Sequence, residues 1–289
     1  MNLSNELLKV KKEKNAALFM PYLTLGDPDF FSSIEFANSF IQAGVSIIEL
    51  GIPFSDPTAD GPIIQKAMVR AAKNSNFSLE TIFETSQKIY LLNPKIFLIY
   101  LTYLNPIVRY NQNKNSFVGE NFLKKCSEIG IRGLVIPDLP FDSYEFLEIS
   151  EQIQKHNLPL NIIPMIAPNT PKKRIQMILT RGNGFVYYIT SLGVTGFRNL
   201  PSIEDYPNRI DFLRKHTELP IFAGFGIHKP EQAKELKKYF DGIIVGSLYH
   251  KTIEDFMNSG ESGNQEKLNK ITREFYEVTK NFVDSLSYS

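Results

Sequence analysis

Glu49 is the one charged residue in an otherwise apolar run, Val45–Gly51. An unpaired carboxylate in apolar surroundings is costly, so such a residue is usually paired, exposed to water or functional. Two interpretations are open at this point. Either the side chain leaves the end of a strand and meets water, or it stands in a partly apolar pocket where burial raises its pKa. The second arrangement would suit proton transfer by general acid–base catalysis near neutral pH.

The next segment carries two aspartates, Asp56 and Asp60, on a backbone restricted by three prolines and two glycines between Gly51 and Pro62. Aspartate before proline or glycine commonly shapes a turn, and this is the simplest interpretation of each residue. Their position directly after Glu49 favours a chemical role for at least one of them. Two carboxyl groups in different surroundings can supply an acid and a base without a metal ion.

Three short glycine motifs follow the last three apolar runs of the chain. Glycines let backbone N–H groups come close to an anion, and a helix that starts after Ser247 would add the positive end of its dipole. Together the motifs predict a phosphate site. They contain Thr195 with Gly196, Gly224 with Gly226, and Gly246 with Ser247.

Other reactive residue types do not gather in the sequence. The histidines are scattered without the spacing of metal ligands, so no metal site is predicted and each is expected at the surface or at a helix end. Cys126 lies on an apolar helical stripe and is expected in the core. Asp138, which ends another apolar run, is interpreted either as a loop-shaping residue or as an assistant to the site. The histidines are His156, His216, His228 and His250.

Eight short apolar runs recur along the chain and alternate with stretches of helical periodicity. Continuous apolar runs are typical of parallel strands that are buried on both faces. The alternation predicts an α/β fold, a (β/α)8 TIM barrel, with a doubly wound open sheet as the alternative. In a barrel the loops after the strands share one face, which would bring Glu49, Asp60 and the glycine motifs together. The runs are 17–24, 45–51, 95–103, 133–137, 160–166, 184–190, 219–224 and 242–246.

We expect a single domain over residues 1–289, with the barrel proper at about 15–257. Residues 1–14 are predicted to form an extra helix that covers the bottom of the barrel. A C-terminal helical extension is predicted at about 266–286. Two unusually long connections, of the kind that is usually functional or disordered, follow the second and sixth runs. They span residues 52–73 and 191–208.

The composition excludes several classes of protein. Hydrophobic residues make up 43% of the chain and charged residues 22%, which excludes a disordered or collagen-like chain. With 32 Lys and Arg against 31 Asp and Glu, the net charge of +1 gives no field that would favour nucleic acid or anionic lipid. The single cysteine, with no signal peptide and no apolar run long enough to span a membrane, predicts a cytoplasmic location.

The sequence resembles the alpha subunits of tryptophan synthase. The resemblance spans about residues 15–257 with the motifs in the same order, and its most specific part is the stretch Glu49–Pro62. The motifs that carry it are Pro21–Pro28, Glu49–Pro62, Tyr103–Pro106, Asp138–Pro140, Gly193–Gly196, Gly224–Ile227 and Gly246–Ser247.

This resemblance implies a lyase that cleaves indole-3-glycerol phosphate into indole and D-glyceraldehyde 3-phosphate, a retro-aldol step in tryptophan biosynthesis. It implies that Glu49 acts as general acid and base, and that Asp60 engages the indole N–H. It also implies an indole pocket bordered by Tyr22 and Tyr187, and a phosphate site that the glycine motifs form with Ser247.

The resemblance further implies a partner, the tryptophan synthase beta subunit, in an allosteric assembly of two alpha and two beta chains. The beta subunit carries pyridoxal phosphate, and no cofactor is expected in this chain. Asp56 and the Asn105–Pro106 turn are then expected at the interface. Two alternatives stay open: a stand-alone lyase that releases free indole, and an activating subunit whose own catalysis has decayed. The presence of both Glu49 and Asp60 disfavours the decayed subunit.

Overall fold

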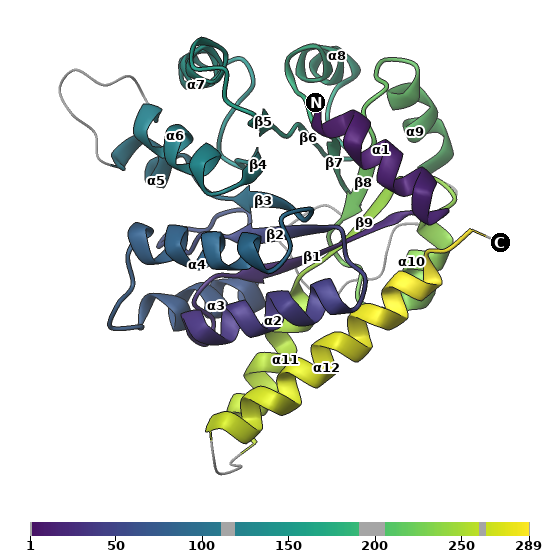
Figure 1. The fold of residues 1–289 in the computed structure, drawn as a ribbon. Coiled ribbons are helices and arrows are strands. Elements are labelled where there is room, and N and C mark those ends of the chain that lie inside the picture. The colour runs from purple at the N-terminus through teal and green to yellow at the C-terminus, as the bar shows by residue number, and fades with distance from the viewer. Residues whose placement is uncertain (1, 111–118, 191–205, 260–263, 289) are drawn as a thin grey trace.

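The structure is a computed structural model that describes residues 2–110, 119–190, 206–259 and 264–288 (Figure 1). Within these residues, 9 parallel strands form one sheet in the order β5-β4-β3-β2-β1-β9-β8-β7-β6. The strands are β1 Leu18–Thr24, β2 Ile47–Gly51, β3 Phe97–Leu101, β4 Ile131–Val135, β5 Asn161–Ile162, β6 Met165–Ile166, β7 Val186–Ile189, β8 Ile221–Gly224 and β9 Gly242–Val245.

The two outer strands of this order, β5 and β6, are consecutive in the chain, and this closes the sheet. The N–H of Ile163 donates to the carbonyl of Leu134 at 2.9 Å, which continues the pairing with β4. The N–H of Tyr187 donates to the carbonyl of Pro164 at 2.8 Å, which continues the pairing with β7. The predicted TIM barrel is therefore confirmed, and the open-sheet alternative is wrong.

The fifth apolar run, predicted as one strand at 160–166, forms two short strands. β5 and β6 are separated by Ile163 and Pro164, and a proline has no N–H to donate to a neighbouring strand. β5 pairs with β4, whereas β6 pairs with β7. At Pro164 the chain therefore stops pairing with β4 and begins to pair with β7.

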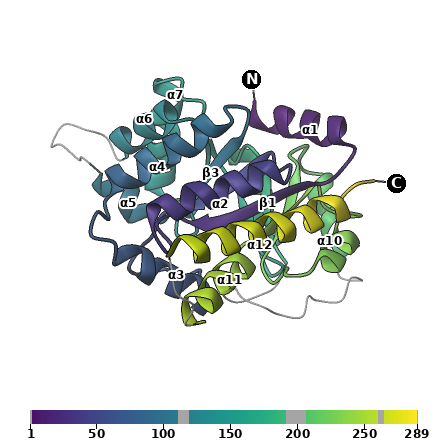
Figure 2. The same ribbon diagram turned by 60° about the horizontal axis from the view of Figure 1, so that its bottom comes forward.

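Helices alternate with the strands and surround the barrel (Figures 1 and 2). Four of them begin after a capping side chain. Asp29, Ser78 and Ser143 each accept a hydrogen bond from the N–H three residues further on, and Asn2 accepts one from the N–H of Ser4. The described helices are α1 Leu3–Lys14, α2 Phe30–Gln42, α3 Pro62–Ala72, α4 Leu79–Leu92, α5 Leu104–Arg109, α6 Glu120–Glu128, α7 Tyr144–Lys155, α8 Lys172–Arg181, α9 Tyr206–Arg214, α10 Pro230–Leu236, α11 Ser247–Asn258 and α12 Asn264–Ser285.

The connection predicted as a long loop at 52–73 contains a helix, α3, so the loop proper is 52–61. Pro62 occupies the first turn of α3, where the lack of an N–H costs nothing. The buried face of α3 follows the spacing i, i+3, i+4, i+7 from Ile64 to Ala71, which is the periodicity of a helix.

Alternation along the strands separates an inner apolar cluster from an outer one. On β1, Leu18 and Met20 belong to the inner cluster, whereas Phe19 packs against the helices outside. β2 alternates in the same way and has Ile47 inside. Because successive side chains point to opposite faces of a strand, Glu49 must also face the interior of the barrel.

The two extra helices predicted at the ends of the chain are confirmed. α1 closes the N-terminal end of the barrel, since Leu3 and Leu7 are fully buried in the inner cluster. The hydroxyl of Ser4 also donates to the carbonyl of Gly184 at 2.7 Å.

α12 lies outside the barrel against α2, α10 and α11 (Figures 1 and 2). Phe275 of α12 stacks on Phe40 of α2 with ring centroids 5.5 Å apart. The division of the chain into one domain stays a prediction. Nowhere in the described part of the chain does a helix combine the length and the apolar character needed to cross a bilayer.

We predict that Leu7→Ala destabilises the protein by about 2–5 kcal/mol, because it empties a buried position at the closed end of the barrel. Urea unfolding, compared at an unchanged slope, measures the loss. Leu8→Ala is the matched control, since Leu8 is only half-buried on the same helix. It is expected to cost clearly less. Equal losses would show that α1 does not close the barrel.

Candidate active site

Glu49 lies inside the barrel, where its strand, β2, pairs with both neighbours. It stands opposite Tyr22 of β1 and Ile99 of β3, and only 1% of its surface is exposed. Its Oε1 makes no hydrogen bond to any described residue. Burial, with a smaller contribution from the charge of Asp60, raises the pKa of Glu49 to about 8. The interpretation in which this side chain meets water is therefore wrong.

Asp60 enters the same interior from the loop between β2 and α3. It is 3% exposed, and the phenol of Tyr103 donates to its Oδ2 at 2.7 Å. The side-chain amide of Gln65 donates to its backbone carbonyl at 2.8 Å. Burial raises the pKa of Asp60 to about 6, although the hydrogen bond from Tyr103 acts in the opposite direction. Near pH 7 the carboxyl of Glu49 is therefore protonated while that of Asp60 is ionised.

Tyr103 is a site residue to which the sequence pattern assigned no role. Its hydroxyl accepts a hydrogen bond from the N–H of Ala59 at 3.1 Å and donates to Asp60. Its ring stacks on Phe54 with centroids 4.9 Å apart. Burial raises the pKa of Tyr103, so the phenol stays protonated and acts as a donor. Two signals in the sequence point to it: its place at the end of the third apolar run, and its inclusion in the motif Tyr103–Pro106.

A small cavity of about 40 Å³ lies where the two carboxyl groups meet the strand ends. Ligand pockets usually measure roughly 300–1,000 Å³, so a substrate needs side chains at the rim to move. Phe225 at this rim has a φ of +77°, a strained conformation for an aromatic residue. The cavity is lined by Tyr22, Glu49, Asp60, Ile64, Leu101, Tyr187, Phe225, Gly226, Ile227, Ile244, Gly246 and Ser247.

Most of the predicted site residues line this cavity. Gly224 lies beside it, at the end of β8 and close to the ring of Tyr187. Thr195 and Gly196 belong to the long connection after β7 and lie outside the described residues. The pattern misses the apolar part of the lining, because an apolar residue at a strand end looks the same in sequence as one in the core. These missed residues are Ile64, Leu101, Phe225, Ile227 and Ile244.

Gly224 and Gly246 make room for the two predicted tyrosines. A Cβ on Gly224 would lie 2.5 Å from the ring of Tyr187, and a Cβ on Gly246 would lie 2.9 Å from the ring of Tyr22. Real Cβ atoms do not approach other atoms so closely, so a side chain at either position displaces a ring. These glycines therefore shape the walls of the cavity, a role that was not predicted from the phosphate motif.

One edge of the cavity has the features of an anion site. Ser247 begins α11 there, as predicted, and Gly246 precedes it without a side-chain cap. The first turn of a helix presents backbone N–H groups that have no intrahelical partner, together with the positive end of the helix dipole. Gly226 lines the same cavity.

Asp56 and Asp138 lie outside the cavity. Asp56 is exposed and accepts a hydrogen bond from the hydroxyl of Ser55 at 2.6 Å, so of the two loop aspartates only Asp60 turns inward. Asp138 accepts a hydrogen bond from the N–H of Leu104 at 2.9 Å, where α5 begins. The structure therefore supports the loop-shaping interpretation of Asp138.

Among the residues that the structure describes, no group of three or more His, Cys, Asp or Glu side chains could hold a metal ion. Cys126 is buried, as predicted. Of the two locations expected for the histidines, His250 has the helix end and not the surface, since it is fully buried in the first turn of α11. Its ring contacts Thr24 and Asp27, two residues near the cavity end of β1.

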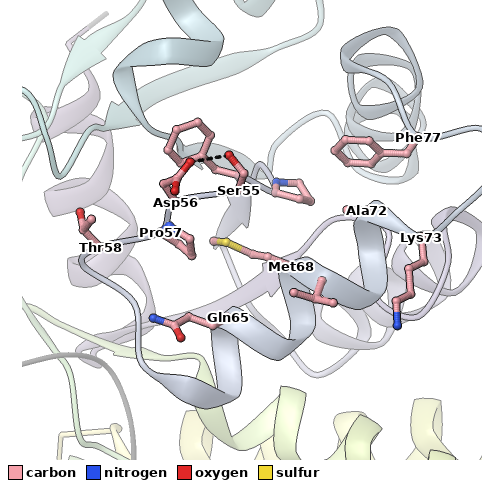
Figure 3. Close-up of a pocket in the computed structure, with 12 residues that line it drawn as sticks. Ser55, Asp56, Pro57, Thr58, Gln65, Met68, Ala72, Lys73 and Phe77 are labelled. Carbon is pink, nitrogen blue, oxygen red and sulfur yellow. Dashed lines mark hydrogen bonds between the residues drawn. The ribbon is translucent and has the colours of Figure 1, made fainter.

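A second hollow, of about 780 Å³, is lined by the loop segment before Asp60 and by α3 (Figure 3). α3 contributes Gln65 and Met68 to it, and the loop contributes Asp56 and Pro57. Val69 in its wall is 56% exposed. Exposed apolar surface beside a polar rim is typical of a site where another molecule binds.

Comparison with known proteins agrees with this geometry. A sequence model of the family described as tryptophan synthase alpha chain matches residues 8–281. The tryptophan synthase alpha chain of Leptospira biflexa is 44% identical over 255 residues, which cover 88% of this chain and 91% of that one. That of Alkaliphilus metalliredigens is 38% identical over 277 residues, or 95% and 97% of the two chains.

Solved structures lead to the same family. The crystal structure of tryptophan synthase subunit alpha from Legionella pneumophila has a TM-score of 0.80 at 29% identity, and the match covers 98% of this chain and 99% of that one. The family match spans nearly the whole barrel and includes both buried carboxyl groups. This chain belongs to the tryptophan synthase alpha chain family.

Proposed function

We propose that this chain is a carbon–carbon lyase that cleaves indole-3-glycerol phosphate into indole and D-glyceraldehyde 3-phosphate. The observation that carries the proposal is the pair Glu49 and Asp60, two carboxyl groups buried in one cavity with pKa values of about 8 and about 6. Near neutral pH this pair offers a protonated acid beside an ionised carboxylate. The retro-aldol reaction needs both.

In the proposed reaction the carboxyl of Glu49 donates a proton to the indole carbon that carries the glycerol chain. The carboxylate of Asp60 balances the positive charge that develops at the ring N–H. Glu49, now ionised, accepts the proton of the adjacent glycerol hydroxyl. The carbon–carbon bond breaks, its electron pair returns to the indole ring, and the hydroxyl oxygen becomes the aldehyde. Glu49 ends the cycle protonated, so no net proton is gained or lost.

The indole ring is proposed to lie between Tyr22 and Tyr187, whose rings wall the cavity. The phosphate is proposed to lie at the edge of the cavity where α11 begins. Gly226 and Gly246 with Ser247 support this placement, because the start of α11 offers backbone N–H groups to an anion. Thr195 and Gly196 are proposed to complete the phosphate site.

We also propose the tryptophan synthase beta subunit as partner, in an allosteric assembly of two alpha and two beta chains. Family membership supports this, and so does the hollow beside Asp56 (Figure 3). The Asn105–Pro106 turn, in α5, is proposed to join the interface. Pyridoxal phosphate is assigned to the beta subunit and no cofactor to this chain, because the carboxyl pair itself supplies acid and base. A cytoplasmic location belongs to the same proposal.

The two alternatives make different demands on the chain. A decayed activating subunit has no need to keep two buried carboxyl groups with raised pKa values, so the pair argues against it. A stand-alone lyase would keep the same cavity. Only the response to a beta subunit separates it from a complexed subunit.

We predict that Glu49→Gln lowers the rate of indole formation by at least about a hundredfold, because positioned acid–base catalysis contributes roughly 10²–10⁴-fold. Steady-state assays of indole release measure the loss. Asp138→Asn is the matched control, since it removes a carboxylate from the same face outside the cavity. It is expected to keep most of the rate. A Glu49→Gln enzyme with more than about a tenth of the wild-type rate would contradict the proposed role.

Thermal unfolding of the same variant shows that the fold is intact and tests the raised pKa. The folded state holds the proton of Glu49 up to about pH 8, whereas the unfolded chain releases it near pH 4.5, the ordinary pKa of a glutamate side chain. The wild type therefore loses stability relative to Glu49→Gln as pH rises from about 4.5 to about 8. The variant is expected to gain in Tm over the wild type, and to gain more at pH 8 than at pH 5. A difference in Tm that does not depend on pH would mean that Glu49 is not buried with a raised pKa.

We predict a bell-shaped pH profile of kcat/KM, which reports the free enzyme, with limbs near pH 6, where Asp60 ionises, and near pH 8, where Glu49 loses its proton. Tyr103→Phe is expected to move the acid limb to higher pH, because it removes a hydrogen bond that lowers the pKa of Asp60. Tyr100→Phe is the control, since this buried phenol donates to Ser86 on the outer side of β3. An acid limb that stays in place in Tyr103→Phe would exclude Asp60 as its origin.

We predict that a saturating beta subunit raises the rate of indole formation by roughly 5–150-fold, the range of a typical coupling between sites. Asp56→Ala is expected to weaken binding of the beta subunit, measured by titration, because Asp56 lies at the rim of the hollow. Asp211→Ala, on the exposed side of α9, is the control. Equal rates with and without the beta subunit would favour the stand-alone lyase.

A further inference from the structure

His250 is the centre of a buried polar network that the proposed reaction does not use. Its Nε2 lies 3.0 Å from the backbone nitrogen of Thr24, and its Nδ1 lies 2.6 Å from Oδ2 of Asp27. Arg70 donates to both oxygens of Asp27, from Nε at 2.6 Å and from Nη2 at 2.8 Å. The side chains of His250 and Asp27 are completely inaccessible to solvent.

The hydrogen bonds of this network fix the form of the imidazole. The N–H of Thr24 can only donate, so Nε2 of His250 must be the acceptor and carries no proton. The proton therefore sits on Nδ1 and is donated to Asp27. The ion pair between Asp27 and Arg70 thus orients the ring, and the ring in turn holds the backbone of Thr24.

This network joins three elements that each contribute to the cavity. β1 carries Tyr22, whose hydroxyl pairs with the hydroxyl of Thr24 at 3.0 Å and whose ring meets the ring of His250 edge-on. α11 carries His250 one turn after Ser247. α3 carries Arg70 and follows Asp60 directly.

The link from α3 reaches the catalytic carboxyl as well. Gln65, one turn before Arg70 on α3, donates to the carbonyl of Asp60 at 2.8 Å. At the surface a second ion pair, Lys66–Glu254 at 2.7 Å, joins α3 to α11. A shift of α3 relative to α11 therefore moves Asp60 relative to Ser247.

A buried ionic network is not the most stable way to fill such a space. Apolar residues of similar volume are often as stabilising or more so, because the charged groups lose their hydration. Its directional hydrogen bonds supply orientation instead, and misplacement by about 1 Å can cost roughly a hundredfold in rate. Because the network lies at the cavity end of the barrel, we expect it to fix the relative positions of the residues that line the cavity.

We infer that His250 is a positioning residue: oriented by Asp27 and Arg70, it holds the end of β1, and with it Tyr22, in register with Glu49 and Asp60. The inference rests on the proposed lyase function. It states that His250, which does not contact the substrate, keeps the residues of the cavity in the positions that the reaction needs. It also predicts which of the two bonds of the imidazole matters most, namely the bond to the N–H of Thr24.

Three substitutions of His250 separate its two bonds. His250→Leu removes both and is expected to lower kcat by roughly a hundredfold, with KM changed far less, because the phosphate edge keeps its own residues. His250→Gln places a carbonyl oxygen near the position of Nε2 and is expected to restore most of kcat. His250→Asn keeps only a donor toward Asp27 and is expected to stay near His250→Leu. All three are compared by thermal unfolding as well as by steady-state kinetics.

The chain offers a matched control at the other end of the barrel. Asp241 is also a buried carboxylate with two basic partners, Lys11 and Arg214, both at 2.5 Å. Asp241→Asn is expected to lower Tm while kcat and KM stay near wild type. A drop in kcat that follows the loss of Tm in the same way at both ends would reduce His250 to a structural role and overturn the inference.

A double-mutant cycle tests the link between Asp27 and His250. If Asp27 acts through the imidazole, the single substitution Asp27→Asn lowers kcat, but the same substitution causes little further loss of kcat in His250→Leu. Additive losses would overturn that link, and wild-type kinetics in His250→Leu would overturn the inference as a whole.

Absence of indole formation by the wild type would instead refute the proposed function. In that case indole binding still tests the network, because the chain has no Trp and fluorescence excited at wavelengths that tyrosine does not absorb reports the ligand. Equal indole affinity in wild type and His250→Leu would then overturn the inference.

Discussion

Glu49 is a carboxyl group buried in an apolar barrel with no basic partner among the described residues, and the rest of the site depends on this constraint. The alternation of β2 turns Glu49 into the barrel, where its Oε1 has no hydrogen-bond partner among the described residues. Burial then makes the neutral form the stable one and raises the pKa to about 8. An acid that keeps its proton at neutral pH is what protonation of a carbon atom requires. The arrangement opposes folding as pH rises toward that value, so stability must come from elsewhere.

A buried carboxylate has basic partners and a lowered pKa at one end of the barrel, and two buried carboxyl groups have a raised pKa at the other end. At the closed end, burial alone would raise the pKa of Asp241, but Arg214 and Lys11 lower it below its usual value, and the ion is satisfied. At the open end no described residue supplies such a cation to Glu49 or Asp60, and their pKa values rise. The same contrast appears in packing, because α1 fills the closed end with Leu3 and Leu7. Stability and chemistry are thus separated along the barrel axis, which is typical of this fold.

The sequence predicted what depends on local pattern and missed what depends on partners across the barrel. The apolar runs predicted most of the strands, and one charge out of place singled out Glu49 while leaving open whether its side chain is exposed or buried. The bond between Tyr103 and Asp60 joins residues 43 positions apart, and the bond between His250 and Asp27 joins residues 223 apart. No spacing rule connects such pairs. Local pattern also failed at Pro164. The apolar run 160–166 looks like one strand in sequence, but it is divided there into β5 and β6.

The glycines of the site show the same limit. Motifs with Gly224 and Gly246 suggest close approach of an anion to the backbone, yet the missing Cβ atoms also leave space for the rings of Tyr187 and Tyr22. Those rings help to keep water from Glu49, which stands between β1 and β3 in the same cavity. The raised pKa of Glu49 therefore belongs to the packing of several strands rather than to the residue itself. A change that displaces either ring would hydrate the carboxyl, lower its pKa and weaken it as an acid, even though no catalytic group had been touched.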